Sequence, residues 1–378
     1  MKKILFNLSC TQPSQDDKRH GGGKYGEVVF RHILEKGYPI AVAIDGKKWL
    51  NPEMQKLIDC YHIPCYDTTL MGFKDMMNQS GCDRFYTPIL SDGMDYEGET
   101  IATIHGTRPM ELQFDSMMLK YNSTSMRDKV KFFIKFFFPK FGYRHAYSIY
   151  RNALLDENFK FVMVSNHSVC SLHSYLPKES LNCDIPVFYS PSTSSTKEMQ
   201  TKFTDKYYLL VSANRWEKNA LRAIIGFDRL FSVGYLQGVK VRITGVKAAT
   251  AYKYKLHNPD RFEFMGYVDD DELEHLYHDA YAFVYPSLNE GFGYPPMEAM
   301  RYGTPALVSP HTSISEVCEG AVLYFNPFSI EEIMARILYM ERSEIHEKYS
   351  RLATEQFAKI TAKQKEDLDA FVEYLYKK

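Results

Sequence analysis

The chain has 378 residues, of which 45% are hydrophobic and 25% are charged. This composition is typical of a folded protein and excludes a disordered or fibrous chain, and the length suits two domains of ordinary size. The 46 Lys and Arg residues balance the 47 Asp and Glu residues. No global electric field therefore attracts nucleic acid, and we expect no nucleic-acid partner.

Seven cysteines are scattered along the chain without a Cys-x-x-Cys pair, which predicts reduced thiols rather than a zinc or redox site. The first apolar run, Ile4 to Leu8, is too short for a signal peptide, and no apolar stretch is long enough to span a bilayer. We therefore expect a cytoplasmic protein that is neither exported nor integral to a membrane.

Short apolar runs alternate with stretches of helical periodicity, a pattern that predicts parallel sheets built from strand-helix-strand units. The first series has strands expected at Ile4 to Leu8, Ile40 to Ile44, Thr100 to Ile104 and Phe161 to Val164, and a helix at Tyr25 to Leu34. We expect residues 1–190 to form a first Rossmann-like domain.

A glycine run stands before the first expected helix. Gly21 to Gly26 satisfies Gly-x-Gly-x-x-Gly, and Asp45 follows about 20 residues later at a strand end, as a dinucleotide site requires. An NAD-dependent oxidoreductase is therefore one hypothesis. Against it, a dozen residues separate the first strand from the first glycine, where the dinucleotide motif has a tight turn.

The segment 126–144 is unusually aromatic and basic. Five of its apolar residues share one helical face: Val130, Phe133, Ile134, Phe137 and Phe141. This pattern suits a helix that lies in a membrane interface beside anionic lipid, and it equally suits a helix packed on the core with solvated lysines.

A polar stretch at 190–197 has the composition of a linker, and a second series of elements follows it. We expect residues 198–361 to form a second Rossmann-like domain, with residues 362–378 forming a helix. The expected strands are Tyr208 to Val211, Val239 to Thr244, Phe262 to Met265, Ala282 to Tyr285, Ala306 to Val308 and Val322 to Tyr324. The expected helices are Asn219 to Leu230, Asp270 to His278 and two that begin at Pro295 and Ser329.

Two cations follow the first strand of this second series. Arg215 and Lys218 stand at the carboxyl end of that strand, the edge at which ligands collect in doubly wound sheets. Such a pair can neutralise a diphosphate, Arg with a planar fork and Lys as a point charge. As a surface turn, Arg-x-x-Lys is also common.

The segment Asn289 to Met300 carries two glycines, Gly291 and Gly293, in front of an expected helix start. Glycines allow backbone amides to approach a phosphate closely, and a helix N-terminus favours anions. Glu290 and Glu298 flank this point, and a carboxylate can accept both hydrogens of a vicinal diol on a ribose or a hexose. Glu298 could instead simply complement the helix dipole.

These segments together resemble the donor half of family 4 (group 1) glycosyltransferases. The resemblance rests on Arg215 to Asn219, Phe264 to Val268 and Glu290 to Gly293 with Glu298, and it spans roughly residues 207 to 340. It implies a GT-B architecture, in which two Rossmann-like domains face each other across a cleft. It also implies a last helix that packs back on the first domain, and a retaining transfer.

The resemblance also implies roles for individual residues. Arg215 and Lys218 would hold the diphosphate, and Glu298 would bind the ribose. Glu290 would hold the donor sugar, together with the loop formed by Gly291, Phe292 and Gly293. Gly22 and Gly23 would cap the donor phosphates or shape the acceptor side of the cleft.

The resemblance assigns His105, at the end of an expected strand, to the transferred sugar. Family members often have Asp after this histidine, whereas Gly106 follows it here. The run Asp269 to Asp271 is similar to the Asp-x-Asp metal motif of another glycosyltransferase fold, but a helical pattern follows it, which favours a helix cap. We expect no metal and no cofactor beyond the donor substrate.

The sequence thus predicts a metal-independent transferase that moves a hexose from a UDP- or GDP-sugar to a glycan or lipid-linked hydroxyl, in surface polysaccharide or glycoconjugate biosynthesis. Its partners would be that donor, that acceptor and, through 126–144, the inner face of the membrane. Two alternatives remain: the oxidoreductase that uses Gly21 to Gly26, and a protein that binds a nucleotide sugar without catalysis.

Overall fold

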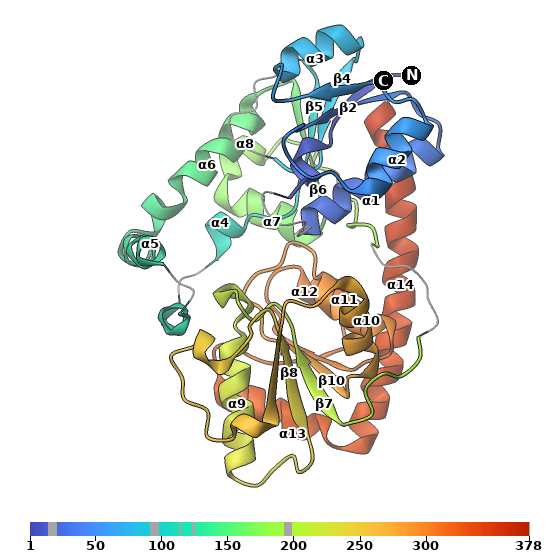
Figure 1. Cartoon of the computed structure of the whole chain (residues 1–378). Helices are drawn as coiled ribbons and strands as arrows, with labels where there is room; N and C mark the ends of the chain where they lie inside the picture. The colour runs from blue at the N-terminus through green and yellow to red at the C-terminus, as the bar shows by residue number, and fades with distance from the viewer. Residues whose placement is uncertain (14–20, 91–97, 113–114, 123–124, 193–198, 378) are drawn as a thin grey trace. The chain divides into compact units, whose positions relative to one another are not determined.

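The chain folds into two compact units, shown in the computed structural model of Figure 1. The structure describes residues 1–13, 21–90, 98–112, 115–122, 125–192 and 199–377. The first unit comprises Met1–Thr107, His145–Thr193 and Thr361–Lys378, and the second comprises Arg108–Arg144 and Ser194–Ile360. Each unit contains one six-stranded parallel sheet with helices around it, which confirms the expected class of two doubly wound α/β domains.

The sheet of the first unit has the strand order β3-β2-β1-β4-β5-β6. Its strands are β1 (Ile4–Asn7), β2 (Ile40–Ile44), β3 (Cys65–Asp67), β4 (Arg84–Thr87), β5 (Thr100–Ile104) and β6 (Phe159–Met163). The helices of this part of the chain are η1 (Ser9–Thr11), α1 (Gly21–Glu35), α2 (Pro52–Cys60), α3 (Phe73–Ser80), α6 (Pro139–Leu155), α7 (Asn166–Tyr175) and α8 (Pro177–Ser180). Strand β1 is completely buried because helices cover both faces of a parallel sheet.

The sheet of the second unit has the order β12-β11-β10-β7-β8-β9. Its strands are β7 (Tyr207–Leu210), β8 (Lys240–Thr244), β9 (Phe262–Gly266), β10 (Ala282–Tyr285), β11 (Ala306–Val308) and β12 (Leu323–Tyr324). Its helices are α4 (Arg108–Glu111), η2 (Ser116–Lys120), α5 (Met126–Phe137), η3 (Trp216–Lys218), α9 (Ala220–Ser232), η4 (Ala249–Ala251), η5 (Pro259–Arg261), α10 (Asp270–Asp279), α11 (Tyr294–Arg301), α12 (Ile314–Cys318) and α13 (Ile330–Met340).

Both sheets have the same topology. Read from one edge, each runs third, second, first, fourth, fifth and sixth strand of its own unit. The strand order reverses between β1 and β4 in the first unit and between β7 and β10 in the second. In such open sheets a ligand binds at the carboxyl ends of the strands beside the reversal. The segments that follow β7 and β10 are therefore the place to look for a site in the second unit.

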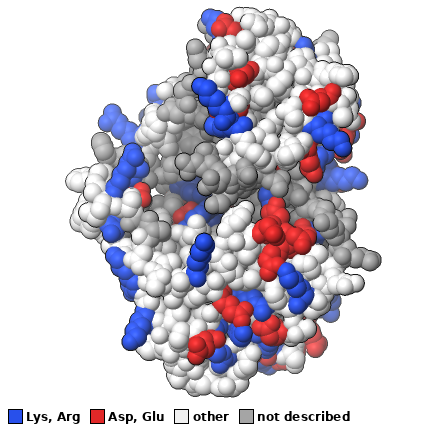
Figure 2. All heavy atoms as spheres, viewed as in Figure 1, with Lys and Arg blue, Asp and Glu red and all other residues white. Residues whose placement is uncertain are grey.

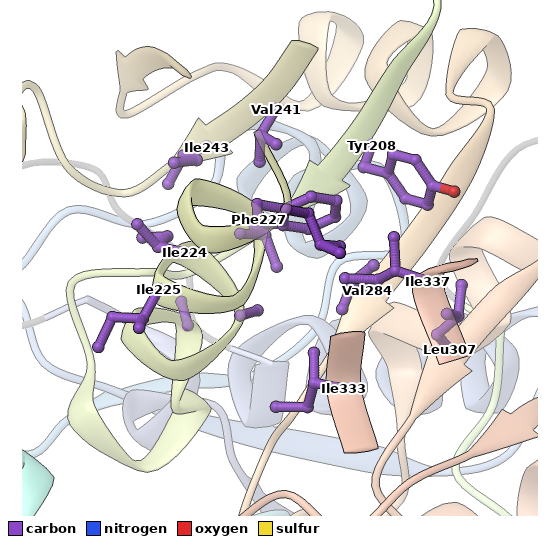
Figure 3. Close-up of a cluster of buried hydrophobic side chains, with 14 of the residues drawn as sticks. Tyr208, Ile224, Ile225, Phe227, Val241, Ile243, Val284, Leu307, Ile333 and Ile337 are labelled. Carbon is purple, nitrogen blue, oxygen red and sulfur yellow. The ribbon is translucent and has the colours of Figure 1, made fainter. Parts of the chain in front are cut away.

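The core of the second unit lies between α9, α13 and the sheet (Figure 3). Nearly all of α9 is buried, and its Phe227 ring lies 5.0 Å from the Tyr208 ring of β7, centroid to centroid. Ile333 and Ile337 of α13 are completely buried in the same cluster. This packing holds β7, and with it the loop that follows β7, in a fixed position.

A single long helix, α14 (Ser343–Tyr376), ends the described chain. It begins within the second unit, and from Thr361 onward its residues belong to the first unit. There the Phe371 ring lies 5.6 Å from that of Tyr86, and Asp367 accepts a 2.8 Å hydrogen bond from the backbone of Tyr189.

The assignment of all of residues 1–190 to the first domain was wrong for residues 108–144, which belong to the second unit. The reason is packing: Tyr121 lies in the core of the second unit, 5.1 Å from the Tyr252 ring, and Asn122 donates a 2.6 Å hydrogen bond to the carbonyl of Thr250. Most of the expected linker, residues 193–197, lies outside the described residues. None of the helices in the described ranges is both long and apolar enough to cross a membrane.

Candidate functional site

The segment after β7 turns sharply and presents Lys218. Ser212 has a φ of 54° and Gly245, at the end of the neighbouring β8, has a φ of 92°. A Cβ on Gly245 would lie 3.0 Å from the backbone nitrogen of Ala213, so a larger residue there would push the loop away. The short helix η3 then ends at Asn219, whose left-handed conformation directs the chain into α9.

Asn219 joins the segments that follow two different strands. Its side-chain amide donates to the carbonyls of Pro286, after β10, and of Pro327, at 3.1 and 2.8 Å. The Leu288 amide also donates to the Glu217 carbonyl at 2.8 Å. The loops after β7 and β10 therefore form one structure at the point where the strand order reverses.

Lys218 and Glu290 meet at this point. Both side chains are buried, and the Lys218 ammonium donates a hydrogen bond to the Glu290 carboxylate. The same carboxylate oxygen accepts hydrogen bonds from the Tyr285 and Ser287 hydroxyls, each 2.6 Å long. The backbone of Glu290 is held as well, since its amide donates to Thr312 Oγ1 at 2.9 Å.

The ionisation of this pair reflects its burial. Burial lowers the pKa of Lys218 below its usual value, and the attraction of Glu290 offsets only part of that effect. Burial alone would raise the pKa of Glu290, but the Lys218 ammonium and the Ser287 and Tyr285 hydroxyls outweigh it, so that pKa is lowered. Glu290 therefore stays a carboxylate at neutral pH and retains its ability to accept hydrogen bonds.

Two arginines add positive charge near Lys218. Arg215 is exposed and pairs with Glu217 at 2.9 Å. Arg108 of α4 lies 3.8 Å from the same Glu217 carboxylate and donates to the Asn289 side chain at 3.3 Å. The charges of Arg215 and Arg108 both add to the lowering of the Lys218 pKa. A cluster of three cations is costly by itself, and a polyanionic ligand would stabilise it.

The loop after Glu290 leads into α11 much as expected. Gly293 has a φ of 112° and precedes the helix, and Pro295 and Pro296 occupy its first turn. Because proline has no N–H, this helix end offers fewer amides to an anion than an ordinary N-terminus. Amide donors for a phosphate would therefore come mainly from the loop of Gly291, Phe292 and Gly293.

Glu298 is the fifth residue of α11 and lies just beyond its first turn. The first turn contains no acidic residue, so a role for Glu298 as a partner of the helix start is not supported. The side chain is half-buried and hydrogen-bonded to Tyr277. Burial raises the pKa of Tyr277 well above its usual value, and the charge of Glu298 raises it further, so this hydroxyl remains a hydrogen-bond donor.

His105 lies in the first unit, directly after β5. Its Nε2 is 2.9 Å from the carbonyl oxygen of Pro88, which follows β4, and its ring meets the Tyr25 ring edge-on with centroids 4.8 Å apart. Gly106 follows with a φ of 139°, a conformation that suits glycine. The histidine is thus oriented at the carboxyl edge of the first sheet, as the sequence predicts, while its role stays a prediction.

The glycine run does not form the loop that we expected. Gly22 and Gly23 lie in the first described turn of α1, which begins at Gly21, and Gly26 lies within the same helix. Gly26 fits close packing, since a Cβ there would come within 2.6 Å of Thr11 and 3.1 Å of Pro88. The dinucleotide motif requires its first glycine in a turn between strand and helix, so this arrangement argues against the oxidoreductase hypothesis.

The aspartate run caps a helix, as expected. Asp269 accepts a 2.8 Å hydrogen bond from the backbone of Glu272, and α10 begins at Asp270. Among the residues that the structure describes, no group of three or more His, Cys, Asp and Glu side chains is arranged to hold a metal ion.

Sequence reasoning missed Tyr285, Ser287 and Arg108 as contributors to this site. Tyr285 ends β10 and Ser287 follows it by two positions, so polar side chains at the carboxyl end of a central strand were the available signal. Arg108 could not be placed beside Lys218 from sequence, because it precedes Lys218 by more than a hundred residues and was assigned to the other domain.

The second half of the chain is similar in sequence to known proteins. Residues 191–358 match the family of group 1 glycosyl transferases. An O-antigen chain mannosyltransferase of Salmonella typhimurium is 35% identical over 162 residues, which cover 41% of this chain and 45% of that protein. O-antigen chain mannosyltransferase B of Escherichia coli is 47% identical over 75 residues, or 20% of each chain. This chain thus matches less than half the length of these relatives.

Solved structures extend the likeness to the whole chain. Sucrose-phosphate synthase of Thermosynechococcus elongatus superposes with a TM-score of 0.67 over 100% of this chain and 98% of its own, at 13% identity. The Anabaena protein Alr3699/HepE, solved with UDP and glucose, gives 0.62 over 100% of both chains at 14% identity. The fold is therefore the GT-B fold, and residues 191–358 match the group 1 glycosyl transferase family.

Proposed function

We propose that this protein is a retaining hexosyltransferase that uses a nucleotide-diphosphate sugar as donor. The observation that carries the proposal is the buried Lys218–Glu290 pair at the strand-order reversal of the second unit, with Arg215 and Arg108 beside it. The site joins cations suited to a diphosphate with a carboxylate suited to sugar hydroxyls.

The chemistry of transfer requires the anomeric carbon of the sugar to lose a nucleoside diphosphate while an acceptor hydroxyl approaches. Negative charge grows on the departing phosphate, so cations and amides placed there in advance lower the barrier. In this proposal Lys218 and Arg215 hold the diphosphate, with amides of the Gly291–Gly293 loop. The leaving phosphate serves as the base that takes the proton of the acceptor hydroxyl.

Donor binding also gives each member of the buried pair a new partner. The diphosphate replaces Glu290 as the anion next to Lys218, and a sugar diol donates to the Glu290 carboxylate. Glu298, held by Tyr277, binds the ribose hydroxyls in the same way. His105 in the first unit contacts the transferred sugar. No metal ion or further cofactor takes part, because the cation cluster supplies the positive charge.

The sugar that we propose is mannose, since the two relatives described above are named as mannosyltransferases of O-antigen chains. The acceptor is a glycan or lipid-linked hydroxyl of a surface polysaccharide, and the protein works in the cytoplasm at the inner face of the membrane. The base of the donor is either guanine or uracil, and a panel of donors distinguishes them.

The test is release of nucleotide from a panel of UDP- and GDP-sugars, with a membrane lipid extract as source of acceptor. We expect release from a mannosyl donor, unchanged by EDTA, and loss of most of that activity in a folded Glu298→Ala variant. Binding of a donor without transfer or slow hydrolysis would identify a sugar-nucleotide sensor instead. Stabilisation by NAD and by no sugar nucleotide in a thermal melt would restore the oxidoreductase hypothesis.

A further inference from the structure

Helix α5 presents an apolar face to solvent. At about 100° per residue, five of its residues fall within an arc of about 100°. They are Met126, Val130, Phe133, Ile134 and Phe137. All five are exposed, with exposed fractions that run from 39% for Ile134 to 73% for Met126. For α5 the core-packed interpretation is therefore wrong, and Phe141, which we placed on the same face, belongs to α6.

The other described side chains of α5 are no better covered. Of its described side chains outside the apolar arc, Lys129 is half-buried and the others are exposed, including Phe136. A 12-residue helix in water is marginal by itself, and amphipathic helices are normally stabilised by packing of the apolar face. The helix does have a capping box, formed by Ser125 and Asp128. The cap fixes where the helix starts, and the five side chains of the apolar face stay 39% or more exposed.

The charges around this face indicate what that surface is. Residues 126–144 contain six Lys and Arg residues and one acidic residue, Asp128, which is engaged in the capping box. Figure 2 shows Lys and Arg side chains over the left edge of this view, where Figure 1 places α5. A second copy of this chain would bring two such basic surfaces together, which disfavours self-association. An anionic surface with an apolar interior would attract the basic side chains and would also cover the apolar face.

We propose that α5 lies in the interface of an anionic lipid bilayer, with Phe133, Phe137 and their neighbours among the acyl chains. Lys129, Lys131 and Arg127 then flank the apolar arc and reach the lipid headgroups, as amphipathic interfacial helices do. The inference deepens the proposed function, because it places the enzyme where a lipid-linked acceptor is found. It predicts binding that needs neither donor nor acceptor.

The experiment is flotation of the full-length protein with phosphatidylcholine vesicles that contain or lack phosphatidylglycerol. We expect wild type to float with the anionic vesicles, and added salt to weaken this binding. The Phe133→Ser/Phe137→Ser variant should bind at least about tenfold more weakly, because the buried apolar area is lost. Its control is Val233→Ser/Tyr235→Ser, two exposed apolar residues of the same unit, which should float like wild type.

A second pair of variants tests the charges. Lys129→Glu/Lys131→Glu should lose binding to anionic vesicles, whereas Lys253→Glu/Lys255→Glu, with the same spacing at exposed positions of the same unit, should retain it. Unchanged unfolding midpoints and unchanged donor hydrolysis show that the α5 variants fold and that the donor site is independent. Failure of wild type to float, or equal flotation of Phe133→Ser/Phe137→Ser, overturns the inference. The inference is also overturned if wild type is a dimer that the Phe133→Ser/Phe137→Ser substitutions convert to a monomer without affecting flotation.

Discussion

The Lys218–Glu290 pair has both a structural and a proposed catalytic role. Lys218→Ala would leave the Glu290 carboxylate buried without its counter-ion, so we expect the free energy of unfolding to fall by about 3–5 kcal/mol. Lys218→Ala/Glu290→Gln should lose less, because a neutral amide is easier to bury than an unpaired charge. Urea unfolding of both variants measures the difference. Equal losses would show that the ion pair does not control stability at this position.

A cleaner test of the cation cluster uses its two arginines, of which Arg215 is exposed and Arg108 half-buried. Arg215 and Arg108 make partly exposed ion pairs with Glu217, which contribute little to stability. We expect Arg215→Ala and Arg108→Ala each to lower the transfer rate by roughly tenfold to a hundredfold, since each removes charge that stabilises the leaving diphosphate. Steady-state rates with saturating donor measure this effect.

The matched control for these two variants is Arg229→Ala. Arg229 is an exposed arginine of the same unit, paired with Glu331 at 3.0 Å and located at the end of α9. Its loss should change neither the rate nor the unfolding midpoint. If Arg108→Ala also left the transfer rate unchanged, Arg108 would not belong to the cation cluster. The cluster would then consist of Arg215 and Lys218, the two cations that the sequence predicts.

For single residues, the sequence predicts that two side chains meet only where both belong to recognisable motifs. Arg215, Lys218 and Glu290 were found because each follows a recognisable strand. Tyr285 and Ser287 escaped because hydroxyl side chains near a strand end have many ordinary uses, and their shared acceptor becomes visible only in three dimensions.

Among the elements, α1 shows that close packing determines which positions of a glycine-rich stretch require glycine. Gly26→Ala would place a Cβ within 2.6 Å of Thr11 and 3.1 Å of Pro88, and we expect it to destabilise the first unit by roughly 1–3 kcal/mol. Gly21→Ala meets nothing within 4 Å, so there the helix propensity of alanine should leave stability unchanged or slightly higher. Chemical unfolding followed by circular dichroism compares the two. A Gly26→Ala protein as stable as Gly21→Ala would contradict this account of the packing.

The strands were predictable where apolar residues predominate, as in β1, β2, β5 and β10. Strand β4 was missed because Arg84 and Thr87 are polar, yet both are buried in contacts that the sequence does not show. The exposure of α5 was not predictable either, because a core-packed helix and an interfacial helix have the same periodicity. Only the positions of the neighbouring helices and strands distinguish a core-packed helix from an interfacial helix.

At the scale of the whole molecule, α14 connects the second unit to the first, and Arg84 secures its end. The Arg84 guanidinium donates to the carbonyls of Leu375 and, at 3.0 Å, of Lys377, and it also binds the Glu99 carboxylate at 2.6 Å. Cations on these carbonyls satisfy acceptors that a helix end leaves unpaired. Glu99 therefore orients the side chain that holds the C-terminal helix on its unit.

Glu99 also gives this arrangement a pH dependence. Burial alone would raise its pKa, but hydrogen bonds from Lys2, Arg84 and Lys160 outweigh burial and hold the pKa at about 2. Since the folded pKa lies below the unfolded value, the unfolded chain binds more protons between the two values. The stability from Glu99 is therefore complete above about pH 4.5 and is lost as the pH falls towards 2.

The Glu99→Gln variant isolates this contribution. Screening by solvent reduces the value of these partly exposed ion pairs, so we expect wild type to exceed Glu99→Gln by roughly 1–2 kcal/mol of unfolding free energy at neutral pH. That difference should shrink towards zero as acid protonates Glu99 in the wild type. Glu53→Gln, which removes an exposed 3.0 Å pair with Arg31, should stay within about 0.5 kcal/mol of wild type throughout. Urea unfolding at a series of acidic pH values gives both curves, and a difference that keeps its neutral-pH size at pH 2 would contradict the role of the Glu99 charge in holding Arg84 and α14.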